Sequence, residues 1–221
     1  MQVPFGSQLL QVFGRIMDAK GLSSAIVFVD LTNAFHRLIR ELVSGVHLPR
    51  EAEEILQALQ AEGLPAHEVA ELLELPCLLQ QLNAPPFLIQ LLQDLHTDTW
   101  LKAPGDERFL VTRRGTRPGS PLADCIFHIL MADITKDINL WFTEQEDFQS
   151  ILHEADLDVE CIVWADDLAL PLATRHASQI PTIIEAALAH VHKVFRRRCF
   201  LLNLNTGKTS VVATFKGPGA A

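Results

Sequence analysis

The stretch that decides the fold is Cys161-Ile162-Val163-Trp164-Ala165-Asp166-Asp167-Leu168-Ala169-Leu170-Pro171-Leu172-Ala173. Two short apolar runs flank adjacent aspartates, which predicts a β-hairpin with strands over 161–165 and 168–173 and a turn made of Asp166 and Asp167. Two-residue turns favour Asn-Gly or Asp-Gly, and neighbouring carboxylates repel each other unless a cation lies between them. Two adjacent aspartates depart from this turn preference although the flanking strands follow the usual pattern, and such a departure indicates a functional site.

A second apolar run that ends in an acid is Ala25-Ile26-Val27-Phe28-Val29-Asp30. Continuous apolarity is typical of a strand covered on both faces, with Asp30 emerging at its tip. A hard divalent cation such as Mg²⁺ binds carboxylate oxygens and keeps several waters. We therefore expect the two acidic strand ends to meet around such a cation, although only the fold can unite residues so far apart in the chain.

Four blocks, in this order, resemble the motifs of reverse transcriptases: Phe28-Val29-Asp30-Leu31-Thr32-Asn33-Ala34-Phe35, Gly115-Thr116-Arg117-Pro118-Gly119-Ser120-Pro121-Leu122-Ala123-Asp124, Trp164-Ala165-Asp166-Asp167, and Leu202-Asn203-Leu204-Asn205-Thr206-Gly207-Lys208-Thr209. The similarity is to the enzymes of non-LTR, LINE-like retroelements and covers roughly residues 8 to 216. It implies an α+β fold like a polymerase palm. We expect a small antiparallel sheet from 25–30, 161–165, 168–173 and 210–215, backed by helices over 120–142 and 179–200.

The resemblance implies RNA-directed DNA polymerase chemistry by two-metal nucleotidyl transfer. Asp30 and Asp166 would be the principal ligands of two Mg²⁺ ions, about 3.5–4 Å apart, for which Mn²⁺ could substitute. Asp167 would assist, and the Leu31 carbonyl would be a further donor. Lys208 would neutralise or protonate pyrophosphate, or would simply lie on the surface of a closing strand.

The same resemblance implies a nucleotide-binding set. Backbone amides at Asn33 and Ala34 would meet the triphosphate, and the rigid ring of Phe35 would reject a ribose 2′ hydroxyl by clash. Arg117 and Gly119 lie in the Gly-rich turn before a helix start, a placement suited to a phosphate. The expected partners are an RNA template, a DNA primer and dNTPs.

Composition sets limits on this interpretation. At 221 residues and 48% hydrophobic content, the chain can form one compact domain. A net charge of −9 is a poor match for a polyanion. Much of the acid excess lies in Glu51 to Glu74, interpreted as solvated helix faces, whereas basic residues cluster at Arg113, Arg114 and Arg117, and at Lys193, Arg196, Arg197 and Arg198. Such local clusters can bind phosphate.

Helical periodicity predicts helices over 7–19 and 34–45, with Ser7 as the first N-cap and Gly21 near its end. Residues 47–95 read as a helical insertion, 97–102 and 108–112 as short strands, 143–158 as a polar connection and 217–221 as a truncated linker. The four cysteines have no paired spacing, which favours buried thiols and an intracellular location over a zinc site. No apolar run reaches the ~20 residues of a membrane span.

Two features lower the expectation of activity. Pro118, His36 and Trp164 depart from the residues most frequent in the family motifs. Only 29 residues precede Asp30, too few for fingers strands, and few residues follow Phe215, where a thumb would come. We therefore expect a palm portion without fingers or thumb, the remainder belonging to a larger polyprotein. The alternatives are an inactive, domesticated palm that serves as a protein or nucleic-acid interaction module and, ranked last, a two-metal nuclease or a nucleotide cyclase.

Overall fold

The computed structural model describes residues 5–102, 104–105, 107–116 and 121–220, except for the side chains of Phe5 and Leu101. The chain divides into two compact units, each built from separate segments. The first, here called the sheet unit, comprises Met1–Thr32, Ile134–Val194 and Leu201–Ala221. The second, the helical unit, comprises Asn33–Asp133 and Phe195–Phe200.

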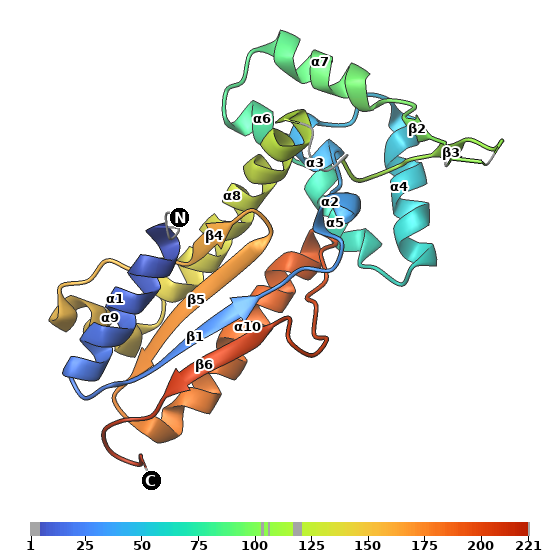
Figure 1. Ribbon diagram of the computed structural model, residues 1–221. Helices are drawn as coiled ribbons and strands as arrows, with labels where there is room; N and C mark the ends of the chain where they lie inside the picture. Colours follow the sequence, from blue (N-terminus) through green and yellow to red (C-terminus); the bar gives the residue numbers. More distant parts are fainter. Residues whose placement is uncertain (1–4, 103, 106, 117–120, 221) are drawn as a thin grey trace. The chain divides into compact units, whose positions relative to one another are not determined.

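A four-stranded antiparallel sheet forms the centre of the sheet unit (Figure 1). Its strand order is β4-β5-β1-β6, with bounds of Ile162–Trp164, Asp167–Thr174, Ser23–Val29 and Ser210–Thr214. Strand β5 is buried from Leu168 to Thr174, as its continuous apolar sequence predicts, whereas the edge strand β6 is mostly exposed. The expectation of an α+β fold with a small antiparallel sheet is confirmed.

The β4–β5 turn differs from the predicted one by one residue. Trp164 pairs with Asp167, so the two turn residues are Ala165 and Asp166, and Asp167 opens strand β5. Ala165 has a φ of 56°, the left-handed value that the first position of a tight hairpin turn requires. The prediction that Asp166 and Asp167 form the turn together is therefore wrong, and the two carboxylates leave the backbone in different structural settings.

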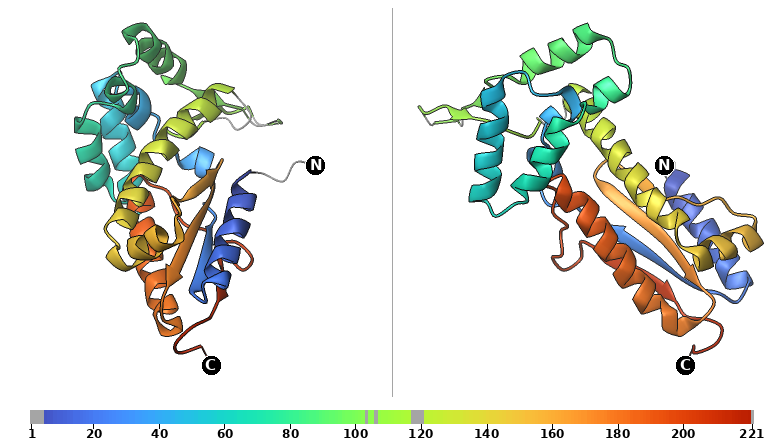
Figure 2. Two further views of the ribbon diagram at one scale, coloured as in Figure 1. Left: turned by 90° about the vertical axis from the view of Figure 1, so that its left-hand side faces the viewer. Right: turned by 180° about the vertical axis from the view of Figure 1, so that it is seen from behind.

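Helices cover both faces of the sheet (Figure 2). Helix α1, Phe5–Ala19, lies on one face. On the other lie α9, Glu146–Ala155, and the sheet-unit portions of α8, Pro121–Thr143, and α10, Ile180–Arg197. The core between these layers includes Phe13, Met17, Val27, Ile138, Leu170, Ile180 and Val191. The expected helices over 120–142 and 179–200 are confirmed to within a few residues.

Two details near these helices differ from the sequence predictions. Ser7 is not a cap, because α1 already begins at Phe5. Helix α9 lies inside the stretch that we interpreted as a polar connection, where Phe148, Ile151 and Leu152 are buried. The acidic composition of that stretch concealed a three-residue apolar stripe.

The helical unit contains the predicted insertion. Its helices are α4, Pro49–Ala61; α5, Ala66–Glu74; α6, Leu78–Gln81; and α7, Pro86–His96. The predicted strands shrink to the two-residue pair β2, Trp100–Leu101, and β3, Leu110–Val111. The expectation that the chain over 47–95 is helical is confirmed.

The predicted helix over 34–45 is wrong, because the chain forms two short helices, α2, Ala34–Arg37, and α3, Glu41–Ser44. Its interruption has a clear cause in hydrogen bonding. The Phe35 carbonyl accepts the N–H of Thr116 at 2.8 Å, and the Leu38 carbonyl accepts the N–H of Gly115 at 2.7 Å. These two carbonyls accept hydrogen bonds from the loop at 115–116, and this pairing takes the place of a continuous α-helix through residues 34–45. The predicted apolar side chains are nevertheless buried: Leu38, Ile39, Leu42 and Val43.

Basic residues in the helical unit are paired with acids. Arg113 contacts Glu54. Arg114 Nη2 donates to both carboxylate oxygens of Glu62, at 2.5 and 2.6 Å. Further pairs include Arg50 with Asp98 at 3.3 Å, Arg197 with Glu71 at 3.9 Å and the buried Arg198 with Asp133 at 2.6 Å. The acids of 51–74 are thus not merely solvated, and these arginines are already partly neutralised.

Other sequence expectations have mixed outcomes. The four cysteines are free, but Cys125 is exposed whereas Cys77, Cys161 and Cys199 are buried. Burial raises the pKa of the Cys161 thiol to about 12, so this thiol is inert at neutral pH. None of the helices in the described part of the chain combines the length and the apolarity needed to cross a bilayer.

Candidate active site at the acidic end of the sheet

Asp30 is fixed by its backbone at the end of β1. Its carbonyl accepts the N–H of Asn203 at 2.8 Å, and its own N–H donates to Thr209 Oγ1 at 3.3 Å. The next residue, Leu31, forms an isolated bridge with Leu202. The predicted motif at 202–209 therefore closes against Asp30, and its Asn and Thr residues act through the backbone of that acid.

Asp167 lies beside Asp30 because of the strand register. Val29 pairs with Leu168, and continuing this antiparallel register by one residue brings Asp30 opposite Asp167. Partial burial raises the pKa of Asp167, and the negative charges of Asp166 and Asp30 raise it further. Lys208 opposes this shift. The three predicted acids thus interact electrostatically at one end of the sheet.

Lys208 supplies the positive charge at this end. The backbone N–H of Lys208 donates to the Asn205 carbonyl at 3.1 Å, in a turn just before β6. Its ammonium lies 3.5 Å from Asp30 Oδ1, with the lysine side chain 51% exposed and the aspartate side chain 25% exposed. Lys208 is therefore an acid-site residue and not simply a surface lysine on the closing strand.

An apolar cavity of about 620 Å³ opens beside these charges. Asp30, Asp167 and Lys208 line it together with apolar side chains from α1, β1 and β4, among them Leu9, Phe28 and Trp164. Trp164 is 70% exposed, which is unusual for so large an apolar side chain. Sequence reasoning missed the contribution of α1, because the periodicity of a helix does not say which strand ends its exposed face approaches.

The acids suit a divalent cation in their chemistry but are not gathered around one point. Carboxylates are the hard oxygen donors that Mg²⁺ and Mn²⁺ prefer, and beside burial, which is the larger cause, the negative charges of Asp166 and Asp30 raise the pKa of Asp167. Within the residues that the structure describes, however, no three His, Cys, Asp or Glu side chains are arranged to hold an ion together. Asp30, Asp166, Asp167 and the Leu31 carbonyl would have to hold the metal, with Lys208 withdrawn from Asp30.

The predicted nucleotide-binding residues belong to the helical unit. Asn33 is exposed with a left-handed φ of 52°, and Ala34 begins the four-residue helix α2. Phe35 stacks on Phe127, with ring centroids 4.3 Å apart, so packing in the unit accounts for this aromatic residue. Arg117 and Gly119 lie outside the described residues. Gly115, which begins the same Gly-rich turn, lies against the His36 backbone.

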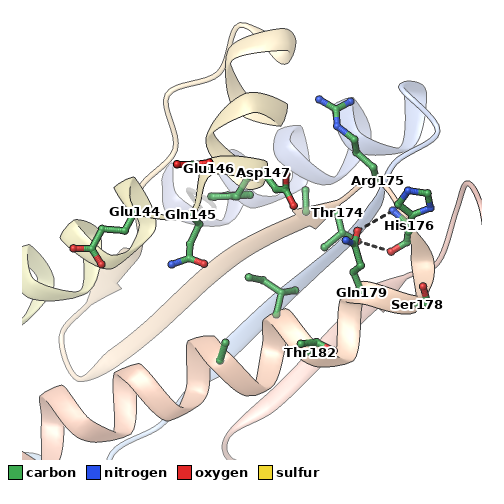
Figure 3. Close-up of a pocket in the computed structure, with 14 residues that line it drawn as sticks. Glu144, Gln145, Glu146, Asp147, Thr174, Arg175, His176, Ser178, Gln179 and Thr182 are labelled. Atoms are coloured by element: carbon green, nitrogen blue, oxygen red, sulfur yellow. Dashed lines mark hydrogen bonds between the residues drawn. The ribbon is translucent and has the colours of Figure 1, made fainter.

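A second cavity, of about 730 Å³, lies at the other end of β5 (Figure 3). It brings together Glu144 from the α8–α9 connection, Asp147 from the first turn of α9, and polar residues that follow β5. Thr174 donates to the His176 carbonyl at 2.9 Å, and the N–H of His176 donates to Gln179 at 3.3 Å. These hydrogen bonds satisfy the polar rim internally, and none of the predicted site residues lies there.

The fold and the site define an α+β protein with an acidic, aromatic-flanked sheet end. Comparison with protein-family models and with curated proteins finds no match for this chain.

Proposed function

We propose that the chain carries the nucleotidyl-transfer site of an RNA-directed DNA polymerase, as the resemblance of its four blocks to retroelement reverse transcriptases implies. One observation carries the proposal. Asp30, Asp166, Asp167 and Lys208, drawn from three of those blocks, meet at one end of the sheet. A chance likeness of short motifs would give no reason for residues so distant in sequence to share one site.

The site's residues have separable roles in this chemistry. Two divalent ions, when bound, would activate a 3′ hydroxyl and stabilise the leaving pyrophosphate. Asp30 and Asp166 would hold them, assisted by Asp167. Lys208 lies on a flexible stem at the edge of the acids, so its ammonium can leave Asp30 and contact a phosphate oxygen. Trp164 and Phe28 offer an apolar surface to a base or a sugar beside the acids.

The proposed partners are an RNA template, a DNA primer, dNTPs and the remainder of a larger polyprotein. The net charge of −9 and the pairing of several arginines with glutamates leave little positive charge for a nucleic-acid backbone. Additional segments would have to supply most of the template and primer affinity.

Primer extension on an RNA template with Mg²⁺ or Mn²⁺ tests the proposal. Because additional segments would have to supply most of the template and primer affinity, the assay uses saturating template and primer. Whatever extension the native chain supports should be lost in Asp166→Asn and kept in the loop variant Asp158→Asn. Equal signals from the native chain and Asp166→Asn would remove the catalytic claim. A titration with Mn²⁺ gives a second measurement that needs no bound primer, and the absence of saturable binding sensitive to Asp30→Asn would also contradict it.

One observation favours the alternative of an inactive palm that acts as an interaction module. Lys208 already neutralises Asp30, and the acids do not converge on one point. The edge strand β6 also exposes Val211 and Val212 and has a free ladder on one side, which suits the addition of a partner strand. This alternative predicts no saturable Mn²⁺ binding at the acidic end.

A further inference from the structure

Several hydrogen-bond donors in the helical unit are buried but unused. The atoms Arg37 Nε, Arg37 Nη1, Arg114 Nη1 and Thr116 Oγ1 are all inaccessible and have no hydrogen-bond partner among the described residues. Thr116 as a whole is only 8% exposed. Leaving a buried donor unsatisfied is costly, and more so for a charged group, so such a cluster requires an explanation.

Two of these residues lie side by side because of a backbone contact. Thr116 donates its N–H to the Phe35 carbonyl, and Gly115 donates its N–H to the Leu38 carbonyl. These two bonds bracket Arg37. The approach is so close that a Cβ added at Gly115 would lie 2.7 Å from the His36 carbonyl oxygen. The backbone of Thr116 is therefore held against the segment that carries Arg37.

The guanidinium of Arg114 lies near the same segment as that of Arg37. Burial raises the pKa of the Cys199 thiol to about 11, while Arg114 and Arg37 each oppose that rise. Both positive charges thus lie near one buried thiol. Glu62 engages Arg114 only through Nη2, which leaves Nη1 unpaired.

We propose that Arg37, Arg114 and Thr116 form a binding site for a phosphate group. Two guanidinium groups and a hydroxyl can donate to different oxygens of one tetrahedral oxyanion, which a single-atom anion cannot match. Glu62 and Glu68 carry the opposite charge near the same thiol, so the phosphate group would compete with the Glu62 carboxylate for Arg114. The Arg114 side chain is 21% exposed, so the cluster borders the surface, and a phosphate group would reach the covered donor atoms by displacing the side chains around them. This site uses no metal and none of the four residues at the acidic end of the sheet.

Titration of the full chain with inorganic phosphate, followed by ³¹P NMR and calorimetry, tests the site. Chloride holds the ionic strength constant, and EDTA removes divalent ions so that the acidic end plays no part. We expect saturable binding that weakens at least tenfold in Arg37→Gln. Arg113→Gln is the matched control, since it removes the same charge from a neighbouring, more exposed residue paired with Glu54. Affinity should be unchanged in that control.

A second variant guards against misfolding of Arg37→Gln. Thr116→Val keeps the side-chain shape, removes the hydroxyl and should weaken phosphate binding several-fold with native circular dichroism. The absence of saturable binding, or equal losses in Arg37→Gln and Arg113→Gln, would overturn the proposal. A short oligothymidylate distinguishes the sources of phosphate: its competition with inorganic phosphate indicates a nucleic-acid backbone, whereas unchanged phosphate binding indicates a free phosphate.

Discussion

Asp167 occupies a position that penalises its own charge. Partial burial, Asp166 and Asp30 all raise the pKa of this carboxyl group, and Lys208 only partly compensates. The folded chain therefore holds the Asp167 proton more tightly than the unfolded chain does. The contribution of this group to stability is largest at low pH, and it falls as pH rises from the ordinary aspartate pKa of 3.8 through the raised value.

Asp167→Asn should accordingly stabilise the protein at pH 7, by about 0.5 kcal/mol once solvent screening of this exposed side chain is considered. The advantage over the native chain should shrink as pH falls towards 4, because the native carboxyl group then becomes neutral too. Urea unfolding of both proteins between pH 4 and 7 measures this difference. Asp158→Asn, in an exposed loop, should show no such trend; a destabilised Asp167→Asn variant at pH 7 would contradict the argument.

Lys208 competes with any cation for Asp30. Lys208→Met should lose a half-exposed ion pair, which costs less than about 1 kcal/mol. The variant should bind Mn²⁺ about fivefold more tightly, because one positive charge near the carboxylates is removed. Mn²⁺ titration followed by electron paramagnetic resonance measures the affinity, with Lys216→Met, whose ammonium pairs with Asp18, as the control. Weaker binding in Lys208→Met would show that this lysine does not oppose the metal.

At the scale of elements, the loop at 115–116 determines how the segment after β1 folds. The apolar period of 34–45 favours one continuous helix, but hydrogen bonds from Gly115 and Thr116 engage carbonyls within it. Gly115 combines a φ of 81° with close contact to the His36 backbone. A residue with a Cβ atom would therefore be strained and would clash at this position.

Gly115→Ala should therefore destabilise the protein by about 3 kcal/mol, the sum of left-handed backbone strain and a backbone clash. Gly63→Ala provides a matched control, because Gly63 has a φ of 69° but open space around the added carbon. That variant should lose only about 1 kcal/mol. Denaturant unfolding compares the two, and equal losses would show that strain alone, and not close approach, restricts position 115.

At the scale of the whole molecule, the distribution of charge matters more than its total. Arg113, Arg114 and Arg197 pair with Glu54, Glu62 and Glu71, so positive charge that the sequence seems to offer to a polyanion is used internally. The chain as a whole carries a net charge of −9. Weak affinity for nucleic acid at physiological salt follows from both facts.

A triple change of Glu54, Glu62 and Glu71 to Gln should raise the affinity for a single-stranded oligonucleotide about tenfold at low salt, because it frees three arginines. A control triple at the exposed Glu53, Glu74 and Glu144 changes the net charge equally, from −9 to −6, and frees none of these pairs. Fluorescence anisotropy across a salt series measures both proteins. Equal gains in the two triples would assign the effect to net charge alone.

Local patterns predicted the elements of the sheet unit well. The apolar runs at 25–30 and 161–173 form strands, and the helix expected over 120–142 buries Ile134 and Ile138 in this unit. Errors arose where another segment intervenes. Helix α9 was concealed by its acids, and the helix at 34–45 was broken by a loop some 75 positions later in the chain.

The sequence by itself determined the candidate acids, their order and the small antiparallel sheet, because alternation and apolar runs are local properties of the chain. Only the tertiary structure decided that Asp30 lies opposite Asp167, that Lys208 contacts Asp30 and that Arg37 lies beside an unsatisfied Thr116. Strand register and packing join residues that no local pattern relates. The charges of these residues interact, and their unpaired donors lie in one region, only because the fold brings them together.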